Sequence, residues 1–192
     1  MNTREPWLYL LFSVLLLFAS YIVFRKIVRK DYLSNGELSW PASLLLLLIF
    51  AALMCLPYLY NSPDWAWFWD ISRASAAWFG YLGCILIIAG FIVAFGTMFW
   101  FGMRRAFGRQ TAGLVQNGLY RWSRNPQILG GYLLMIGTAV QRPPLYALGW
   151  VGLYGIIGHV MILSEEEHLH VQYGDAYDQF CAQVPRYLRI LP

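Results

Sequence analysis

Long apolar segments alternate with short polar ones along the chain, and their lengths predict membrane-spanning helices. At about 1.5 Å per residue, a helix of about 20 apolar residues crosses a hydrocarbon core about 30 Å thick. Five segments reach or approach this length: Trp7–Val28, Pro41–Tyr60, Ala74–Phe101, Ile128–Gln141 and Leu145–Ser164. The fourth is short for a span. We therefore predict an all-α integral membrane helical bundle with about five transmembrane helices.

An arginine and two prolines separate the last two apolar segments. Consecutive prolines cannot continue a helix, so Arg142-Pro143-Pro144 predicts a turn and residues 128–164 predict a hairpin of helices four and five. From Glu165 the chain becomes polar, which predicts a cytosolic C-terminal helix that ends near Val184-Pro185.

The composition limits the domain organisation. The chain has 192 residues, of which 59% are hydrophobic and 12% charged, and this charged fraction is about half that of a soluble domain. A chain of this length cannot hold the bundle and a separate soluble catalytic domain, so we predict a single membrane domain over 1–192. Its predicted parts are helices one to three (1–101), a cytosolic loop that binds a cofactor (102–127), the hairpin (128–164) and a cytosolic tail that completes the site (165–192).

Basic residues are distributed unevenly between the two faces of the predicted bundle. Eleven of the 14 Lys and Arg residues fall in the 25–40 segment, the 102–127 segment and the C-terminal tail, which share one face. Because loops rich in positive charge stay in the cytoplasm, we expect this face to be cytoplasmic and the N-terminus to lie outside. The membrane would be a bacterial inner membrane or the endoplasmic reticulum. These flanking residues explain the net charge of +4, so no nucleic-acid partner is predicted. The sequence leaves the oligomeric state open.

Two polar stretches flank the predicted hairpin, which should bring them together on one face. They read TAGLVQNGLYRWSRNPQILGG from Thr111 and SEEEHLHVQYGDAYDQFCAQVPRYL from Ser164. In the first, Asn125 and Pro126 suit the cap and the first turn of a helix. In the second, three consecutive glutamates do not suit attachment to an anionic leaflet, but they do suit the arginines of the preceding loop or a cationic ligand. The pair of stretches therefore predicts a polar site at the membrane surface.

The histidines and cysteines show no spacing typical of a metal site, and none is predicted. His168 and His170 are two residues apart on a predicted helix and so point to different faces, although His170 and Glu166 could meet. We interpret His159 as a packed or interfacial residue, and Cys55, Cys84 and Cys181 as structural residues.

These two stretches together resemble the isoprenylcysteine carboxyl methyltransferase and phospholipid methyltransferase superfamily of membrane enzymes. The pattern of that superfamily runs roughly LVxxGxYRxxRHPxYxG, then EExxLxxxFGxxY, then a proline-arginine stretch, and the resemblance extends from Leu114 to about Arg186. It implies methyl transfer from S-adenosylmethionine to a lipophilic or lipid-linked acceptor that enters from the bilayer. Glu166, three residues before Leu169, stands where the superfamily has a glutamate that binds the cofactor. The cofactor-binding residues that the resemblance implies are Ala112, Gly113, Leu114, Val115, Tyr120, Asn125, Pro126, Gln127, Ile128 and Glu166. We assign positioning roles in catalysis to Arg124 and Glu165, since methyl transfer needs alignment and desolvation but no nucleophilic residue.

The sequence also departs from the family pattern. Asn125 replaces the usual histidine, and Ile128 replaces a usual tyrosine. Isoprenylcysteine methyltransferases carry an arginine shortly before the glutamates, but Met161–Ser164 contains none, which argues against a prenylated-cysteine carboxylate as the acceptor. An amine, a thiol or a hydroxyl remains open.

Two alternatives belong to other functional classes. A membrane reductase of the sterol reductase type would bind the phosphates of NADPH through Arg104, Arg105, Arg109, Arg121 and Arg124. A non-catalytic membrane adaptor would keep a degenerate pocket. The acidic triplet suits a cationic methyl donor better than a polyanion, so methyl transfer is the favoured hypothesis.

Overall fold

The computed structural model describes residues 6–61, 77–101, 113–141 and 145–188, and all secondary structure in these residues is helical. The helices are α1 (Pro6–Ile22), α2 (Arg29–Asn35), α3 (Trp40–Asn61), α4 (Ala77–Phe101), α6 (Pro126–Gln141), α7 (Leu145–Tyr173) and α8 (Asp175–Gln183). A π-helical turn (Val23–Val28) joins α1 to α2 without a break, and a short 3₁₀ turn (Gly118–Arg121) precedes α6.

Four helical segments of the described chain are long and apolar enough to cross a membrane, so the protein is a multi-pass membrane protein. These segments are Trp7–Asn35, Trp40–Pro57, Trp78–Trp100 and Ala147–Tyr173. They correspond to four of the five predicted spans. Helix α6, the predicted fourth span, has 16 residues and is therefore about 24 Å long, less than a typical hydrocarbon core. A fifth crossing stays a prediction.

The predicted end of the first helix at Val28 is wrong. The helix continues through the basic residues that we assigned to a loop and ends at Gly36, whose φ of 71° is left-handed and whose N–H donates to Tyr32 O at 3.1 Å. Lysine and arginine are good helix formers, and glycine in this conformation is a common helix terminator. The extra helical turns carry Tyr32 to the end of the bundle.

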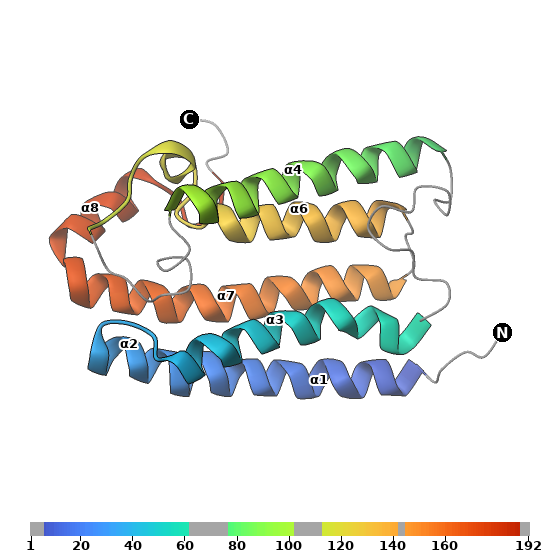
Figure 1. Ribbon diagram of the computed structural model, residues 1–192, viewed down its shortest axis with the longest axis horizontal. Coiled ribbons are helices and arrows are strands. Elements are labelled where there is room, and N and C mark those ends of the chain that lie inside the picture. Colours follow the sequence, from blue (N-terminus) through green and yellow to red (C-terminus); the bar gives the residue numbers. More distant parts are fainter. Residues whose placement is uncertain (1–5, 62–76, 102–112, 142–144, 189–192) are drawn as a thin grey trace.

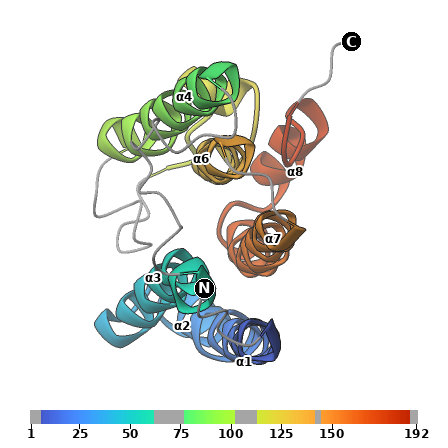
Figure 2. The ribbon, with the colours of Figure 1, turned by 90° about the vertical axis from the view of Figure 1, so that its right-hand side faces the viewer.

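The long helices lie side by side in the bundle (Figure 1). Viewed end-on, α6 lies between α4 and α7, while α7 also contacts α1 and α3 (Figure 2). Helices α2 and α8 and the 3₁₀ turn gather at one end of the bundle, and α1 begins at the opposite end. The C-terminal half of α7 reaches the end of the bundle where α2, α8 and the 3₁₀ turn gather.

Glycines allow α4 and α6 to pack closely. A Cβ atom at Gly90 would lie 2.6 Å from Gly130 O and 2.7 Å from Leu134 N, and one at Gly137 would lie 2.7 Å from Gly83 O. Small residues at seven-residue spacing on both helices therefore bring the two backbones into contact, as is common between helices in membranes. This contact fixes α6, and so the polar stretch that enters it.

Side chains of α7 donate to two carbonyls at irregular points of the N-terminal helices. Pro57 has no N–H to donate to Leu53 O four residues earlier, and the Trp150 indole donates to that oxygen at 2.8 Å. Ser164 Oγ donates to Phe24 O in the π-helical turn at 2.9 Å. An unpaired carbonyl is costly in hydrocarbon, so the Trp150 bond replaces the one that Pro57 cannot make, and the Ser164 bond adds a second link between α7 and the N-terminal helices.

Candidate functional site

One face of the C-terminal half of α7 lines a cavity at the end of the bundle. Its residues recur at helical spacing and are Glu165, Glu166, His168, Leu169, Gln172 and Tyr173. Residues three and four apart share one face of a helix, so this face is continuous. The opposite wall comes from Gly113–Val115 and from Tyr120, and Tyr32 of α2 closes one side. Three segments that are distant in sequence thus build the cavity.

A small apolar cluster holds the 113–121 segment against α7 and α8. Tyr120, Tyr177, Phe180 and Val184 are buried together. Gly118 adopts a φ of 63°, and a Cβ there would lie 2.2 Å from the Trp100 ring, so this position needs glycine for both reasons. The segment is therefore positioned by packing on both of its sides.

Hydrogen bonds join the turn before α6 to the C-terminal tail. The backbone N–H of Arg124 donates to Pro185 O at 3.0 Å, and the carbonyl of Arg186 accepts from Ser123 Oγ at 3.3 Å and from Asn125 Nδ2 at 3.0 Å. Asn125 occupies the predicted position before the first residue of α6, and its amide group binds the tail. These bonds bring Arg124 and Arg186 to the same place.

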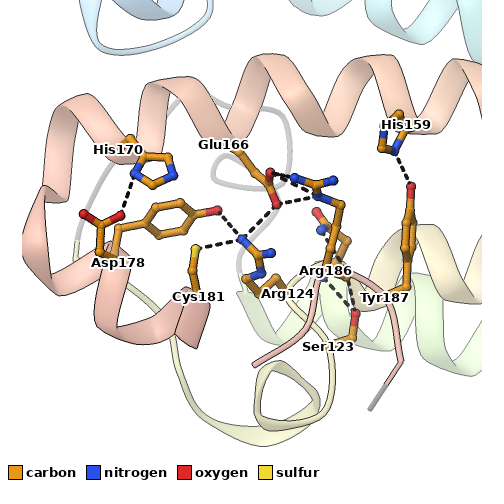
Figure 3. Close-up of polar contacts among 11 residues, drawn as sticks. Ser123, Arg124, His159, Glu166, His170, Asp178, Cys181, Arg186 and Tyr187 are labelled. Carbon is orange, nitrogen blue, oxygen red and sulfur yellow. Dashed lines mark hydrogen bonds and ion pairs between the residues drawn. The ribbon is translucent and has the colours of Figure 1, made fainter. Parts of the chain in front are cut away.

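Glu166 lies between these two arginines (Figure 3). Its Oε1 is 2.9 Å from Arg124 Nη1, and its Oε2 is 2.6 Å from Arg186 Nη2, while Arg186 Nε donates to both oxygens at 3.0 and 3.1 Å. The Glu166 side chain is only 10% exposed, so these are charge-assisted bonds in a partly desolvated place. The hydrogen bonds with Glu166 raise the pKa of Arg186 above its ordinary value.

Arg124 also contacts α8. Its Nη1 lies 2.7 Å from Cys181 Sγ and 3.4 Å from Tyr177 Oη. Burial, followed by the negative charge of Glu166, raises the pKa of Tyr177 well above its ordinary value. The Tyr177 hydroxyl is therefore neutral at pH 7 and cannot act as a phenolate base.

The three consecutive glutamates have three different environments. Glu167 turns away from the cavity, where it forms ion pairs with Arg25, at 2.8 Å, and with Arg29. Glu165 lines the cavity, and no hydrogen bond or ion pair involves its carboxylate within the described residues. The cavity thus holds one carboxylate that is neutralised by arginines and one that is not.

Two buried polar atoms in the cavity wall also lack a partner within the described chain. They are Nε2 of Gln127 and Nε2 of His168. The His168 ring stacks on Tyr32 with centroids 4.4 Å apart and planes at 10°, which fixes its orientation. Buried polar atoms are almost always hydrogen-bonded, so such a pair indicates a site for a polar ligand.

The cavity has the chemistry for such a ligand. It encloses about 90 Å³ and is open to solvent at its mouth. Tyr120, Tyr173 and Phe180 supply aromatic surface. A ligand that carries a positive charge, hydrogen-bonding groups and an aromatic ring would match this lining.

Most of the predicted site residues gather here. The cavity wall includes Gly113, Leu114, Val115, Tyr120, Asn125, Gln127 and Glu166 from the predicted cofactor set, and both Arg124 and Glu165. Ala112 lies outside the described residues. Pro126 begins α6 as predicted, and Ile128 packs in the main core with its carbonyl accepting from Tyr154 Oη at 3.1 Å; neither lines the cavity.

Several residues of the cavity wall were not predicted from the sequence, although helical spacing could have indicated some of them. His168, Leu169 and Gln172 lie three, four and seven positions after Glu165, which places them on its helix face. Tyr32 carried no such signal, because only the tertiary fold brings α2 beside α7.

The remaining histidines lie outside the cavity wall. His170 does not meet Glu166, because its Nδ1 is 2.9 Å from Asp178 Oδ1 on α8. His159 is partly buried, and its Nδ1 lies 2.7 Å from Tyr187 Oη. His159 is thus packed, as predicted.

The chain matches a known protein family. The phospholipid methyltransferase family model matches residues 78–176, which is more than half of the chain. This range includes α4, α6, α7 and most of the cavity wall, while Tyr32 and Arg186 lie outside it. No curated protein and no solved structure matches the chain.

Proposed function

Because the chain belongs to the phospholipid methyltransferase family, whose members are S-adenosylmethionine-dependent methyltransferases, we propose that it methylates the headgroup of a phospholipid. The reaction would take place at the cytosolic membrane surface, where the cavity opens and where the basic residues lie. The donor-binding site would be the cavity between α7, α2 and the 113–125 segment. The unpaired carboxylate of Glu165 in its wall is the observation that carries this assignment.

The cavity lining suits this methyl donor. S-adenosylmethionine, when bound, supplies a methyl group on a positively charged sulfonium and also carries an ammonium, a carboxylate and an adenine ring. Glu165 would bind one of the cationic groups, and the neighbouring aromatic faces add cation–π attraction. The unpartnered Nε2 atoms of Gln127 and His168 would bind polar atoms of the ligand.

Glu166 and the two arginines would help to position the donor and would not react with it. Both oxygens of Glu166 are bound by Arg124 and Arg186, so its carboxylate orients two guanidinium groups at the cavity wall. In a transfer that depends on alignment and on exclusion of water, fixed groups of this kind contribute through geometry. We therefore assign the contact with the donor's positive charge to Glu165 and not to Glu166.

The two alternative functions are less well supported. In the described part of the lining, the charged groups are two carboxylates and one guanidinium that is already paired, which is a poor site for the phosphates of NADPH. Arg104, Arg105 and Arg109 lie outside the described residues. A non-catalytic adaptor would have no need for unpaired polar groups in a buried wall.

Titration calorimetry of the purified protein with S-adenosylmethionine tests this proposal. The wild-type protein should bind the donor and should not bind NADPH. Glu165→Gln should weaken donor binding roughly ten- to a hundredfold, because it removes a charge-assisted contact worth about 1.5–3 kcal/mol. Glu167→Gln, whose carboxylate faces away from the cavity, is the matched control and should bind like the wild type. Absence of donor binding, or equal effects of the two variants, would contradict the proposal.

A further inference from the structure

A second hollow lies between α6 and α7, on the part of α7 that belongs to a membrane-spanning segment. It is lined by apolar side chains, among them Leu129, Val151 and Ile156, and its volume is about 640 Å³. The polar side chains of its wall are those of His159, Tyr132 and Tyr187. It is thus a mostly apolar groove on a helix that is long and apolar enough to cross a membrane.

Glycines of α7 give the groove its shape. A Cβ atom at Gly152 would meet nothing within 4 Å, so this glycine borders open space in the groove. At Gly155 a Cβ would lie 2.3 Å from the Tyr132 hydroxyl, so here the groove wall approaches the helix backbone. The groove is therefore a built feature of two packed helices, with space that a larger residue at position 152 would fill.

One short stretch of the C-terminal tail joins the groove to the cavity. Tyr187, at the polar end of the groove, directly follows Arg186, which binds Glu166 in the cavity wall. Glu166, Arg186, Tyr187 and His159 follow one another across the site (Figure 3). A molecule lying in the groove would thus have its polar end beside the proposed donor site.

We propose that the groove binds one acyl chain of the phospholipid acceptor and that the His159–Tyr187 pair contacts its headgroup. This inference rests on the proposed function and adds the place of the acceptor to it. An acyl chain is the apolar molecule that surrounds a membrane-spanning segment of α7. The imidazole of His159 and the hydroxyl of Tyr187 can hydrogen-bond to the polar groups of a headgroup.

The groove would contribute alignment more than affinity. Transfer of a chain from the bilayer to the groove gains no hydrophobic energy, so selectivity must come from packing contacts and from the headgroup. A chain held in a fixed groove places its headgroup at one distance from the cavity, which converts an encounter in the membrane plane into an oriented one. A lipid at any other position around the helices lacks this constraint.

Photo-crosslinking of the full chain in nanodiscs tests the inference directly. The probe is a phosphatidylethanolamine with a diazirine in one acyl chain, and the labelled peptides are mapped by mass spectrometry. Crosslinks should concentrate on the groove walls of α6 and α7. Gly152→Leu should reduce this labelling at least fivefold, whereas Gly149→Leu should not, because position 149 also borders open space but does not line the groove.

Other results would overturn the inference. Labelling that is even around all lipid-facing helices would mean ordinary boundary lipid, and equal labelling of the Gly152→Leu and Gly149→Leu proteins would mean that the groove is not occupied. The wild-type map needs no variant, so it decides the matter even if Gly152→Leu does not fold. Tyr187→Phe should lower the preference for the phosphatidylethanolamine probe over a phosphatidylcholine probe, which a role in packing alone would leave unchanged.

Donor binding separates this inference from the proposed function. If the wild-type protein fails to bind S-adenosylmethionine but is labelled in the groove, the proposed function fails and the lipid site stands. If donor binding is normal and the groove is not labelled, the proposed function stands and the lipid site fails. In turnover assays, Gly152→Leu should raise KM for a dioleoyl acceptor about tenfold and leave KM for a dihexanoyl acceptor unchanged.

Discussion

Three adjacent glutamates show how position on a helix assigns different tasks to identical side chains. Successive residues are turned by about 100°, so the three carboxylates face three directions. One faces the open cavity, one faces an arginine before α6 and an arginine of the tail, and one faces arginines of the π-helical turn and of α2. Glu165 has no partner among the described residues, Glu166 has two arginines, and Glu167 bridges to Arg25 and Arg29. The same chemical group thus serves ligand binding, tail attachment and helix packing in three consecutive positions.

Glu166 and Glu167 should differ in their contributions to stability. Glu166→Gln leaves Arg124 and Arg186 without a carboxylate in a place where Arg124 is 13% exposed, so we expect a loss of about 2–4 kcal/mol in the free energy of unfolding. Glu167→Gln breaks ion pairs at a side chain that is 37% exposed and should cost about 1 kcal/mol or less. Urea titration in detergent micelles measures both. A larger loss for Glu167→Gln would show that the tail is not held through Glu166.

The sequence predicted the residues of this site where they are close in the chain and missed those that only folding brings together. The three glutamates were expected to meet loop arginines or a cationic ligand, and the resemblance assigned Glu166 to the cofactor, which stays a prediction. In the structure Glu166 pairs with Arg124 of the loop and with Arg186 of the tail. The stacking of His168 on Tyr32 could not be predicted, because Tyr32 was assigned to a loop between two spans. The π-helical turn that positions it has no signature in the apolar pattern.

Helix α7 combines the two proposed binding sites in one rigid element. It runs without interruption from Leu145 to Tyr173, so its N-terminal part lines the groove and its C-terminal part lines the cavity. The predicted boundary at Ser164 marks a change in polarity, and the helix continues through it. A continuous helix keeps acceptor and donor sites at a constant separation.

Close packing of α4 with α6 should depend on the glycines at their contact. Gly90→Ala would place a Cβ 2.6 Å from the Gly130 carbonyl oxygen, so the two backbones must separate, and we expect a loss of about 1–3 kcal/mol in stability. Gly96→Ala on the same helix has no atom within 4 Å and is the matched control, which should be neutral. Thermal unfolding in detergent distinguishes them. Equal melting temperatures for the two variants would mean that α4 and α6 do not pack in this way.

At the level of the whole bundle, the basic residues and the cavity lie at the same end. Arg25, Arg29, Arg124 and Arg186 all bind glutamates beside the cavity, so the charge asymmetry that predicted the cytoplasmic face also marks the site. The sequence predicted the all-helical membrane fold well, because apolar length is a direct consequence of bilayer thickness. It could not predict which helices pack against which, since this depends on glycine contacts and buried carbonyls that no periodicity shows.

Because segments before and after α6 line the same cavity, we predict that the short helix α6 crosses the membrane. The 113–125 segment follows α4 and the cavity face of α7 lies at its C-terminal half, so the chain must return to the far end of the bundle between them, and α6 is the element that does so. A helix of 16 residues can span if the bilayer thins locally around it. With five crossings, the distribution of basic residues predicts that the N-terminus lies outside and the cavity in the cytoplasm.

Cysteine labelling in intact cells tests this topology, with the native Cys55, Cys84 and Cys181 first replaced by serine or alanine. A membrane-impermeant maleimide should label Asp64→Cys and Arg142→Cys, two positions outside the described residues, because both follow spans that end outside the cytoplasm. Gln116→Cys should react only after the membrane is opened. The reverse labelling pattern would mean that the protein has the opposite orientation in the membrane. Protection of position 142 together with position 116 would mean that α6 does not cross the membrane. The second result would separate the two walls of the cavity by the bilayer, and neither the donor site nor the acceptor groove could then exist as proposed.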